Sequence, residues 1–186
     1  MSGARSPDAP VKSHSHQRWA RVEATGVREF LAFLLGPEAY ALPLSCVREI
    51  MRVPTITDVP RAPHDVLGIV SVRGQVTTLI DLRRKLKVAE APISTRTRVL
   101  LVDQGDEILG LLCDRVLQVH RLSEDEVEMA SVLGSEASSY VMGIGRPGQR
   151  KTGGGREGKA VAAASVGDIL ILLDPIGLLK RQASYG

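Results

Sequence analysis

VLGIVSVRGQVTTLIDLRRKL, residues 66–86, contains two apolar runs separated by a short Arg-Gly-Gln break. Both runs are rich in Val, Ile and Thr, which predicts two paired strands joined by a tight turn. Gly74 supplies the positive φ that such a turn requires, and Arg73 then projects from the tip. Asp81 ends the second strand and is predicted to cap a short helix over residues 82–87. The stretch does not resemble catalytic machinery, and it predicts a hairpin that presents a surface.

The order of hydrophobic segments around this hairpin occurs twice along the chain. The matching segments are 31–44 and 99–112, 47–53 and 115–122, 68–69 and 143–144, and 78–86 and 171–180. Each half contains about five short strands and one closing helix, which Asp81 caps in the first half and Asp174 in the second. Because a lone five-stranded sheet must close or be covered to protect its edges, we expect an all-β fold with short helices, built as two packed five-stranded barrels. Whether strands are exchanged between the halves is open at this point.

Composition also defines the domain organisation. Residues 1–27 mix Ser, Pro, His and charged residues without periodicity, which predicts a disordered N-terminal extension. One domain is expected over 28–181, with approximate halves 28–95 and 96–181, a basic Gly-rich insertion at 146–160 and a C-terminal tail at 182–186. No apolar run reaches the roughly 18 residues of a membrane span, and the N-terminus has no signal-peptide pattern. We therefore expect a cytoplasmic protein without direct membrane insertion.

The net charge of +3 is unevenly distributed along the sequence. Residues 28–145 carry 13 basic and 16 acidic side chains, a net charge of −3, whereas the excess of basic residues lies in 1–27 and 146–160. A nucleic-acid groove needs clustered basic residues on the folded domain itself. The charge distribution therefore argues against nucleic acid as a partner.

The residues that usually carry catalysis or bind metals are scattered. Cys46 and Cys113 lie in apolar segments without metal-ligand spacing, which predicts reduced thiols in the core. His14 and His16 have no nearby cysteine or carboxylate to complete a metal site. No nucleophile, base or acidic pair occurs in a recognisable catalytic spacing, so we expect neither an enzyme nor a cofactor.

Two glycine motifs resemble phosphate-binding loops. Residues 143–148 spell GxGxxG, but the proline and glycines that follow do not predict the helix that this fingerprint needs. Residues 153–160 spell GxxxxGK followed by Ala, where a Ser or Thr would hold magnesium. A nucleotide-dependent regulatory protein that uses the loop Gly153–Lys159 is the alternative function to be tested.

The span from about Phe30 to Leu179 resembles the CheW-like domain of bacterial chemosensory coupling proteins. The resemblance rests on the order and spacing of VREIMRV, TITDVPRAPHDVLGIVSVRGQVTTLIDLRRKL, GLLCDRVLQV, YVMGIG and ILILLD. It implies two five-stranded SH3-like barrels and a non-catalytic adaptor of chemotaxis signal transduction. The implied partners are the cytoplasmic tip of methyl-accepting chemoreceptors and the regulatory domain of a CheA-type histidine kinase.

The resemblance also implies a receptor-contact site at Val47, Glu49, Gly68 and Arg73, in the groove between the barrels. Such a set offers apolar contact, a close backbone approach and two opposite charges that orient a helical partner. From the residues alone, Val47 is equally consistent with core packing, and Gly68 with a bend or bulge. For Glu49 and Arg73, the default interpretation from the residues alone is that they are solvated surface charges. Ser71 stands where the family often has Asn, two residues before this arginine.

Overall fold

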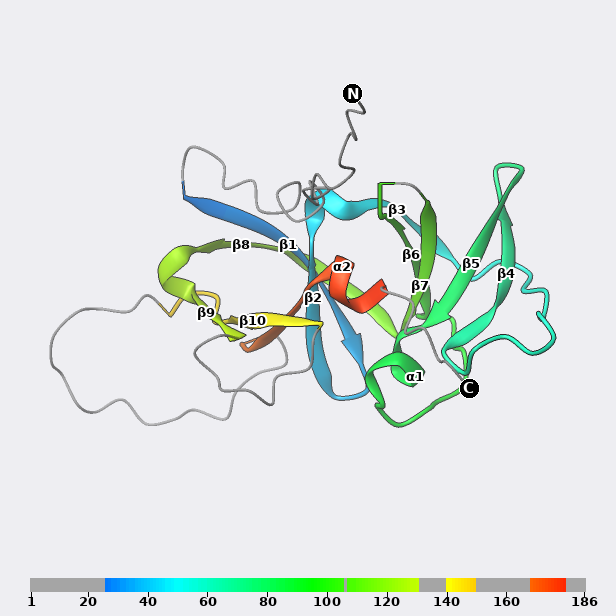
Figure 1. Ribbon diagram of the computed structural model, residues 1–186. Coiled ribbons are helices and arrows are strands. Elements are labelled where there is room, and N and C mark those ends of the chain that lie inside the picture. The colour runs from blue at the N-terminus through cyan, green and yellow to red at the C-terminus, as the bar shows by residue number, and fades with distance from the viewer. Residues whose placement is uncertain (1–25, 106, 131–139, 150–167, 180–186) are drawn as a thin grey trace, which may run out of the picture.

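The computed structural model describes residues 26–105, 107–130, 140–149 and 168–179 of the chain. These residues form two β-sheets with short helices (Figure 1). The six-stranded sheet contains β1 (Val27–Leu35), β2 (Glu38–Pro43), β8 (Arg115–Ser123), β9 (Val127–Met129), β10 (Val141–Gly145) and β11 (Leu170–Leu173). The five-stranded sheet contains β3 (Val47–Arg52), β4 (Val66–Val72), β5 (Gln75–Asp81), β6 (Arg98–Asp103) and β7 (Ile108–Cys113). The helices are η1 (Leu44–Cys46), α1 (Leu82–Leu86), η2 (Glu124–Glu126) and α2 (Pro175–Leu179).

The two sheets repeat one strand order. The orders are β8-β1-β2-β11-β10-β9 and β3-β6-β7-β5-β4, so hairpin β1–β2 occupies the place that hairpin β6–β7 occupies in the other sheet. Each sheet contains one parallel pair, β2 with β11 and β5 with β7. The two sequence halves therefore do not coincide with the two sheets, because each N-terminal hairpin pairs with strands of the other half.

One sheet has six strands where five were expected, and the difference is small in structural terms. β9 pairs with β10 next to Gly143, and the corresponding position of the other sheet holds a single bridge between Thr57 and Ile69. The connector that contains Thr57 therefore runs where a sixth strand would lie, but it pairs at one residue.

The core consists of three hydrophobic clusters, one of which joins the two sheets. One cluster lies within the six-stranded sheet and includes Phe30 and Ala32, and a second lies within the five-stranded sheet and includes Val99 and Leu101. The third draws side chains from both sheets and from α1 and α2, and it includes Phe33. Successive residues of a strand point to opposite faces, so β1 and β6 each contribute to two clusters. Burial on both faces explains why these strands have continuous apolar sequences.

The opening hairpin forms largely as the sequence predicts. Val72 pairs with Gln75, so the turn contains two residues, Arg73 and Gly74, rather than three. Gly74 has the predicted positive φ of 83°, and Arg73 also has a positive φ, of 49°. Two consecutive residues of positive φ match the right-handed twist of paired strands. The side chain of Asp81 accepts a hydrogen bond from the backbone N–H of Arg83 at 2.9 Å, which confirms the predicted helix cap.

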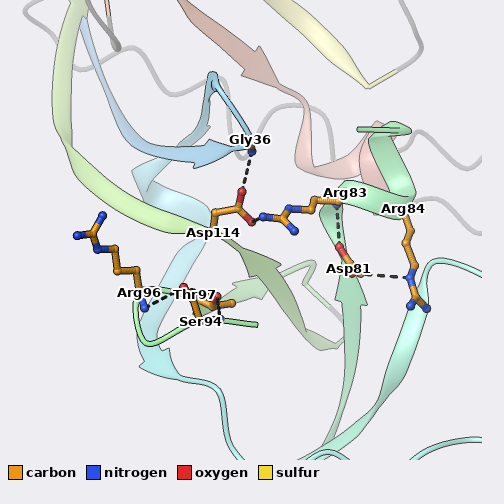
Figure 2. Close-up of polar contacts among 8 residues, drawn as sticks. All are labelled: Gly36, Asp81, Arg83, Arg84, Ser94, Arg96, Thr97 and Asp114. Carbon is orange, nitrogen blue, oxygen red and sulfur yellow. Dashed lines mark hydrogen bonds and ion pairs between the residues drawn. The ribbon is translucent and has the colours of Figure 1, made fainter. Parts of the chain in front are cut away.

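A polar contact links α1 to the six-stranded sheet (Figure 2). Asp114 accepts a hydrogen bond from the backbone N–H of Gly36, in the β1–β2 turn, at 2.6 Å. Its other carboxylate oxygen pairs with the guanidinium of Arg83, and the two side chains are 22% and 11% exposed. The backbone N–H of Asp114 also donates to the carbonyl of Leu34 at 3.0 Å. This carboxylate therefore fixes the position of one sheet relative to the other.

Among the described residues, no helix is long and apolar enough to cross a membrane.

Candidate partner-binding surface

Glu49 and Arg73 form an ion pair across the open side of the five-stranded sheet. Glu49 lies on β3 and Arg73 follows β4, and these are the two outermost strands of that sheet. Their side chains nevertheless meet, with 2.9 Å between the guanidinium nitrogen and the carboxylate oxygen. Met51 of β3 and Val72 of β4 also pack against the same hydrophobic cluster. The sheet therefore curls until its two edges approach, and the ion pair lies at the place where they meet.

This ion pair is open to solvent. The Arg73 side chain is 81% exposed and that of Glu49 is 37% exposed. Val76, at the start of β5, is a large apolar side chain that is 74% exposed. An exposed pair of this kind contributes about 0–1 kcal/mol to folding stability. The Glu49–Arg73 surface, which we define as Glu49 and Arg73, therefore offers two opposite charges to a partner.

Val47 and Gly68 have structural roles beside this surface. Val47 is half-buried against the cluster that joins the two sheets. Gly68 lies at a bulge in β4 with φ of +152°, and a Cβ there would lie 2.5 Å from the carbonyl oxygen of Thr57. Gly143 in β10 faces the same restriction from the carbonyl oxygen of Glu128. Both glycines therefore permit the close approach of a neighbouring backbone.

The structure thus brings two of the four predicted site residues into direct contact, Glu49 and Arg73. Val47 and Gly68 shape the strands that carry them. The sequence pattern did not single out the exposed Val76, although an apolar residue beside a polar turn was the available signal. It also missed the pair in which the Arg48 guanidinium donates to Asp103 at 2.9 Å, because nothing local relates residues so far apart in sequence.

The described residues contain no group of three or more histidine, cysteine, aspartate or glutamate side chains placed to hold a metal ion. Cys46 and Cys113 are buried free thiols, as predicted. Burial raises the pKa of each to about 12, so both are protonated and unreactive at neutral pH. Burial also lowers the pKa of His120. None of these groups lies on the Glu49–Arg73 surface.

The two glycine motifs have different outcomes. Gly145 ends β10 and is followed by a turn over residues 146–149, so the helix that a dinucleotide fingerprint requires does not start there. The loop Gly153–Lys159 lies outside the described residues, as do His14 and His16.

Comparison with known proteins supports one family throughout. The family model described as "CheW-like domain" matches residues 29–183. The chain is 32% identical over 124 residues to the chemotaxis protein CheW of Helicobacter pylori, which covers 67% of this chain and 75% of that protein. It is 30% identical over 122 residues to the protein FrzA of Myxococcus xanthus, which covers 66% of this chain and 76% of the relative.

A solved structure has the same fold. The scaffolding protein TtCheW from Thermoanaerobacter tengcongensis aligns with a TM-score of 0.67 at 21% identity, over 83% of this chain and 94% of that one. The predicted resemblance and the predicted fold class are therefore confirmed, and so is the expectation of a non-catalytic scaffold. The chain belongs to the CheW-like domain family, whose members are the scaffolds that couple chemoreceptors to the kinase CheA in chemotaxis.

Proposed function

We propose that this chain binds the cytoplasmic tip of a methyl-accepting chemoreceptor through the Glu49–Arg73 surface, and the regulatory domain of a CheA-type histidine kinase through another surface. The assembly forms in the cytoplasm at membrane-bound receptor arrays. Membership of the CheW-like family supports the two kinds of partner. The residues of the receptor contact are those that the family resemblance implies, and the contact between Glu49 and Arg73 supports them.

The observation that carries this assignment is the backbone conformation of Arg73. Its φ of 49° lies in the left-handed region, which costs a non-glycine residue about 1–2 kcal/mol. The side chain recovers little of this cost, because its ion pair with Glu49 is exposed. The two-residue turn requires a positive φ at both of its central residues, so the pairing of β4 with β5 holds Arg73 in this conformation. The turn therefore presents a long cation at a fixed place, with a carboxylate beside it that sets its direction.

The pair suits a partner helix that carries charged side chains. A carboxylate on the partner competes with Glu49 for the Arg73 guanidinium. Because Arg73 is already oriented by Glu49, little side-chain entropy is lost on binding. The charges therefore determine which partner binds and in which orientation, more than how tightly it binds.

Co-sedimentation with receptor-tip fragments and CheA tests the proposal. We expect Arg73→Glu to weaken receptor binding at least about tenfold, through repulsion of a partner carboxylate, while kinase binding is retained. Arg61→Glu is the matched control, because Arg61 is exposed, also has a positive φ of 61° and makes the same charge change. A chain that binds neither receptor nor kinase would contradict the proposed function.

A charge-swapped variant separates binding from folding. Glu49→Arg combined with Arg73→Glu can rebuild the internal ion pair with reversed charges, so stability should match that of the original chain within about 0.5 kcal/mol. Receptor binding should remain lost, because the partner now meets the opposite charges. Recovery of receptor binding in the swapped variant would show that the pair acts through structure alone.

A further inference from the structure

A second concave surface lies on the other face of β3. It is a groove of about 310 Å³ lined by Ile50, Arg96, Arg98, Arg115 and Val116, which we call the arginine groove. Ile50 belongs to β3 and Val116 to β8, and these are edge strands of different sheets. Neighbouring residues of a strand point to opposite faces, so Ile50 and Glu49 face different sides of β3. The arginine groove is therefore distinct from the Glu49–Arg73 surface.

Positive charge gathers in and beside this groove. Arg98 lies directly opposite Arg52 in the β3–β6 ladder, a placement that destabilises a sheet when the charges are alike. In the part of the chain that the structure describes, none of the ion pairs includes Arg52, Arg96, Arg98 or Arg115. Other arginines, such as Arg48 and Arg121, do pair with carboxylates. The protein therefore gathers positive charge here without neutralising it.

The guanidinium of Arg98 is held in place, whereas Arg96 is held through its backbone alone. One guanidinium nitrogen of Arg98 donates to the carbonyl oxygens of Thr95 and Thr97, each at 2.8 Å, so its remaining N–H groups are free to face a ligand. Arg96 lies in a turn where its backbone N–H donates to the hydroxyl of Ser94 at 3.2 Å. Figure 2 shows the Arg96 side chain pointing away from that turn. A fixed guanidinium binds a carboxylate at a lower entropic cost than a mobile one.

The floor of the groove is apolar. Ile50 is 43% exposed, and Val116 packs against the cluster that joins the two sheets. A ligand that fits both the arginines and the apolar floor carries negative charges on either side of an apolar group. A protein segment with two acidic side chains flanking a leucine or similar residue has this pattern.

We propose that the arginine groove docks an acidic segment of a protein partner, with carboxylates on Arg98 and Arg115 and an apolar side chain on Ile50. A nucleic acid fits less well, because it would leave Ile50 without an apolar contact, and because residues 28–145 have a net charge of −3. The proposal is independent of the receptor contact at Arg73.

The test uses the full chain and a short fluorescent peptide that contains two Glu-Leu-Glu triplets, with a Gln-Leu-Gln peptide as its control. We expect the acidic peptide to bind, and the Gln peptide to bind at least about tenfold more weakly. Arg98→Glu combined with Arg115→Glu should lower the affinity at least about tenfold, whereas Arg61→Glu and Arg73→Glu should leave it unchanged. Methyl NMR should show the peptide shifting the signals of Ile50 and Val116.

Several results would overturn the proposal. These are no binding of the acidic peptide, equal binding of the two peptides, or an equal loss in Arg61→Glu. An oligonucleotide that displaces the peptide and binds more tightly would assign the groove to a polyanion instead. If the double variant fails to fold, Arg96→Glu provides the same comparison from an exposed turn. Loss of peptide binding in Arg73→Glu would show that the peptide binds the Glu49–Arg73 surface, and this result would also contradict the proposal.

Discussion

Replacing Asp114 by alanine should weaken the attachment between the two sheets. The substitution removes the acceptor of the Gly36 N–H bond and the partner of Arg83, whose side chain is 11% exposed. The Arg83 Nε is already buried without a hydrogen-bond partner, so the charge would be left poorly compensated. Breaking a fully buried pair costs about 3–5 kcal/mol and an exposed pair about 0–1 kcal/mol. Because Asp114 is 22% exposed, we expect a loss of about 2–3 kcal/mol.

Urea unfolding followed by circular dichroism measures this loss. A chain of this size should also melt about 5–10 °C lower, at about 2–4 °C for each kcal/mol. Glu29→Ala is the matched control, since it removes the exposed pair with Arg121 and should cost less than about 1 kcal/mol. Asp114→Asn keeps an acceptor for Gly36 and should cost less than the alanine variant. An Asp114→Ala protein as stable as the original within about 0.5 kcal/mol would refute the reasoning.

The other predictions concern the buried thiols and two glycines. Cys46 and Cys113 should resist thiol reagents in the native protein at pH 8 and react fully in urea, and fast native labelling would contradict their burial. Because folding raises their pKa from 9.0 to about 12, the unfolded state loses these protons first, so the free energy of unfolding should fall between about pH 9 and pH 12. Replacing both by alanine should reduce that slope. Gly68→Ala should cost more than about 2 kcal/mol in urea unfolding, because the added Cβ meets the backbone of Thr57. Gly74→Ala has open space around it and should cost about 1 kcal/mol. Equal losses in the two variants would contradict the argument that Gly68 permits a close backbone approach.

Local chemistry made part of this fold predictable. Gly74 in the turn and the cap at Asp81 depend on residues a few positions apart, and both form as expected. The repeated order of apolar segments predicted two similar sheets, because each segment must bury its apolar face. The family resemblance, rather than any local pattern, led to the scaffold function.

Long-range geometry accounts for what the sequence did not reveal. Whether hairpin β1–β2 pairs with the first or second set of strands depends on which faces pack together, and both choices satisfy the local pattern. The Glu49–Arg73 contact depends on how far the five-stranded sheet curls. Gly68 was predicted to serve either a partner contact or a bulge. The register shift at Gly68, and the carbonyl oxygen of Thr57 that a Cβ there would meet, support the bulge. No single residue in the sequence indicated the arginine groove, because strands of two different sheets form it.

The division of strands between the sheets has a consequence for biosynthesis. All five strands of one sheet lie in the continuous segment 47–113, whereas the other sheet is completed by β10 and β11, near the end of the chain. During translation the inner unit can close as soon as β7 has left the ribosome, while the β1–β2 hairpin waits with its apolar edges unpaired. That hairpin is the part of the nascent chain most exposed to aggregation. Early pairing of β1 with β8 therefore determines how long this vulnerable state lasts.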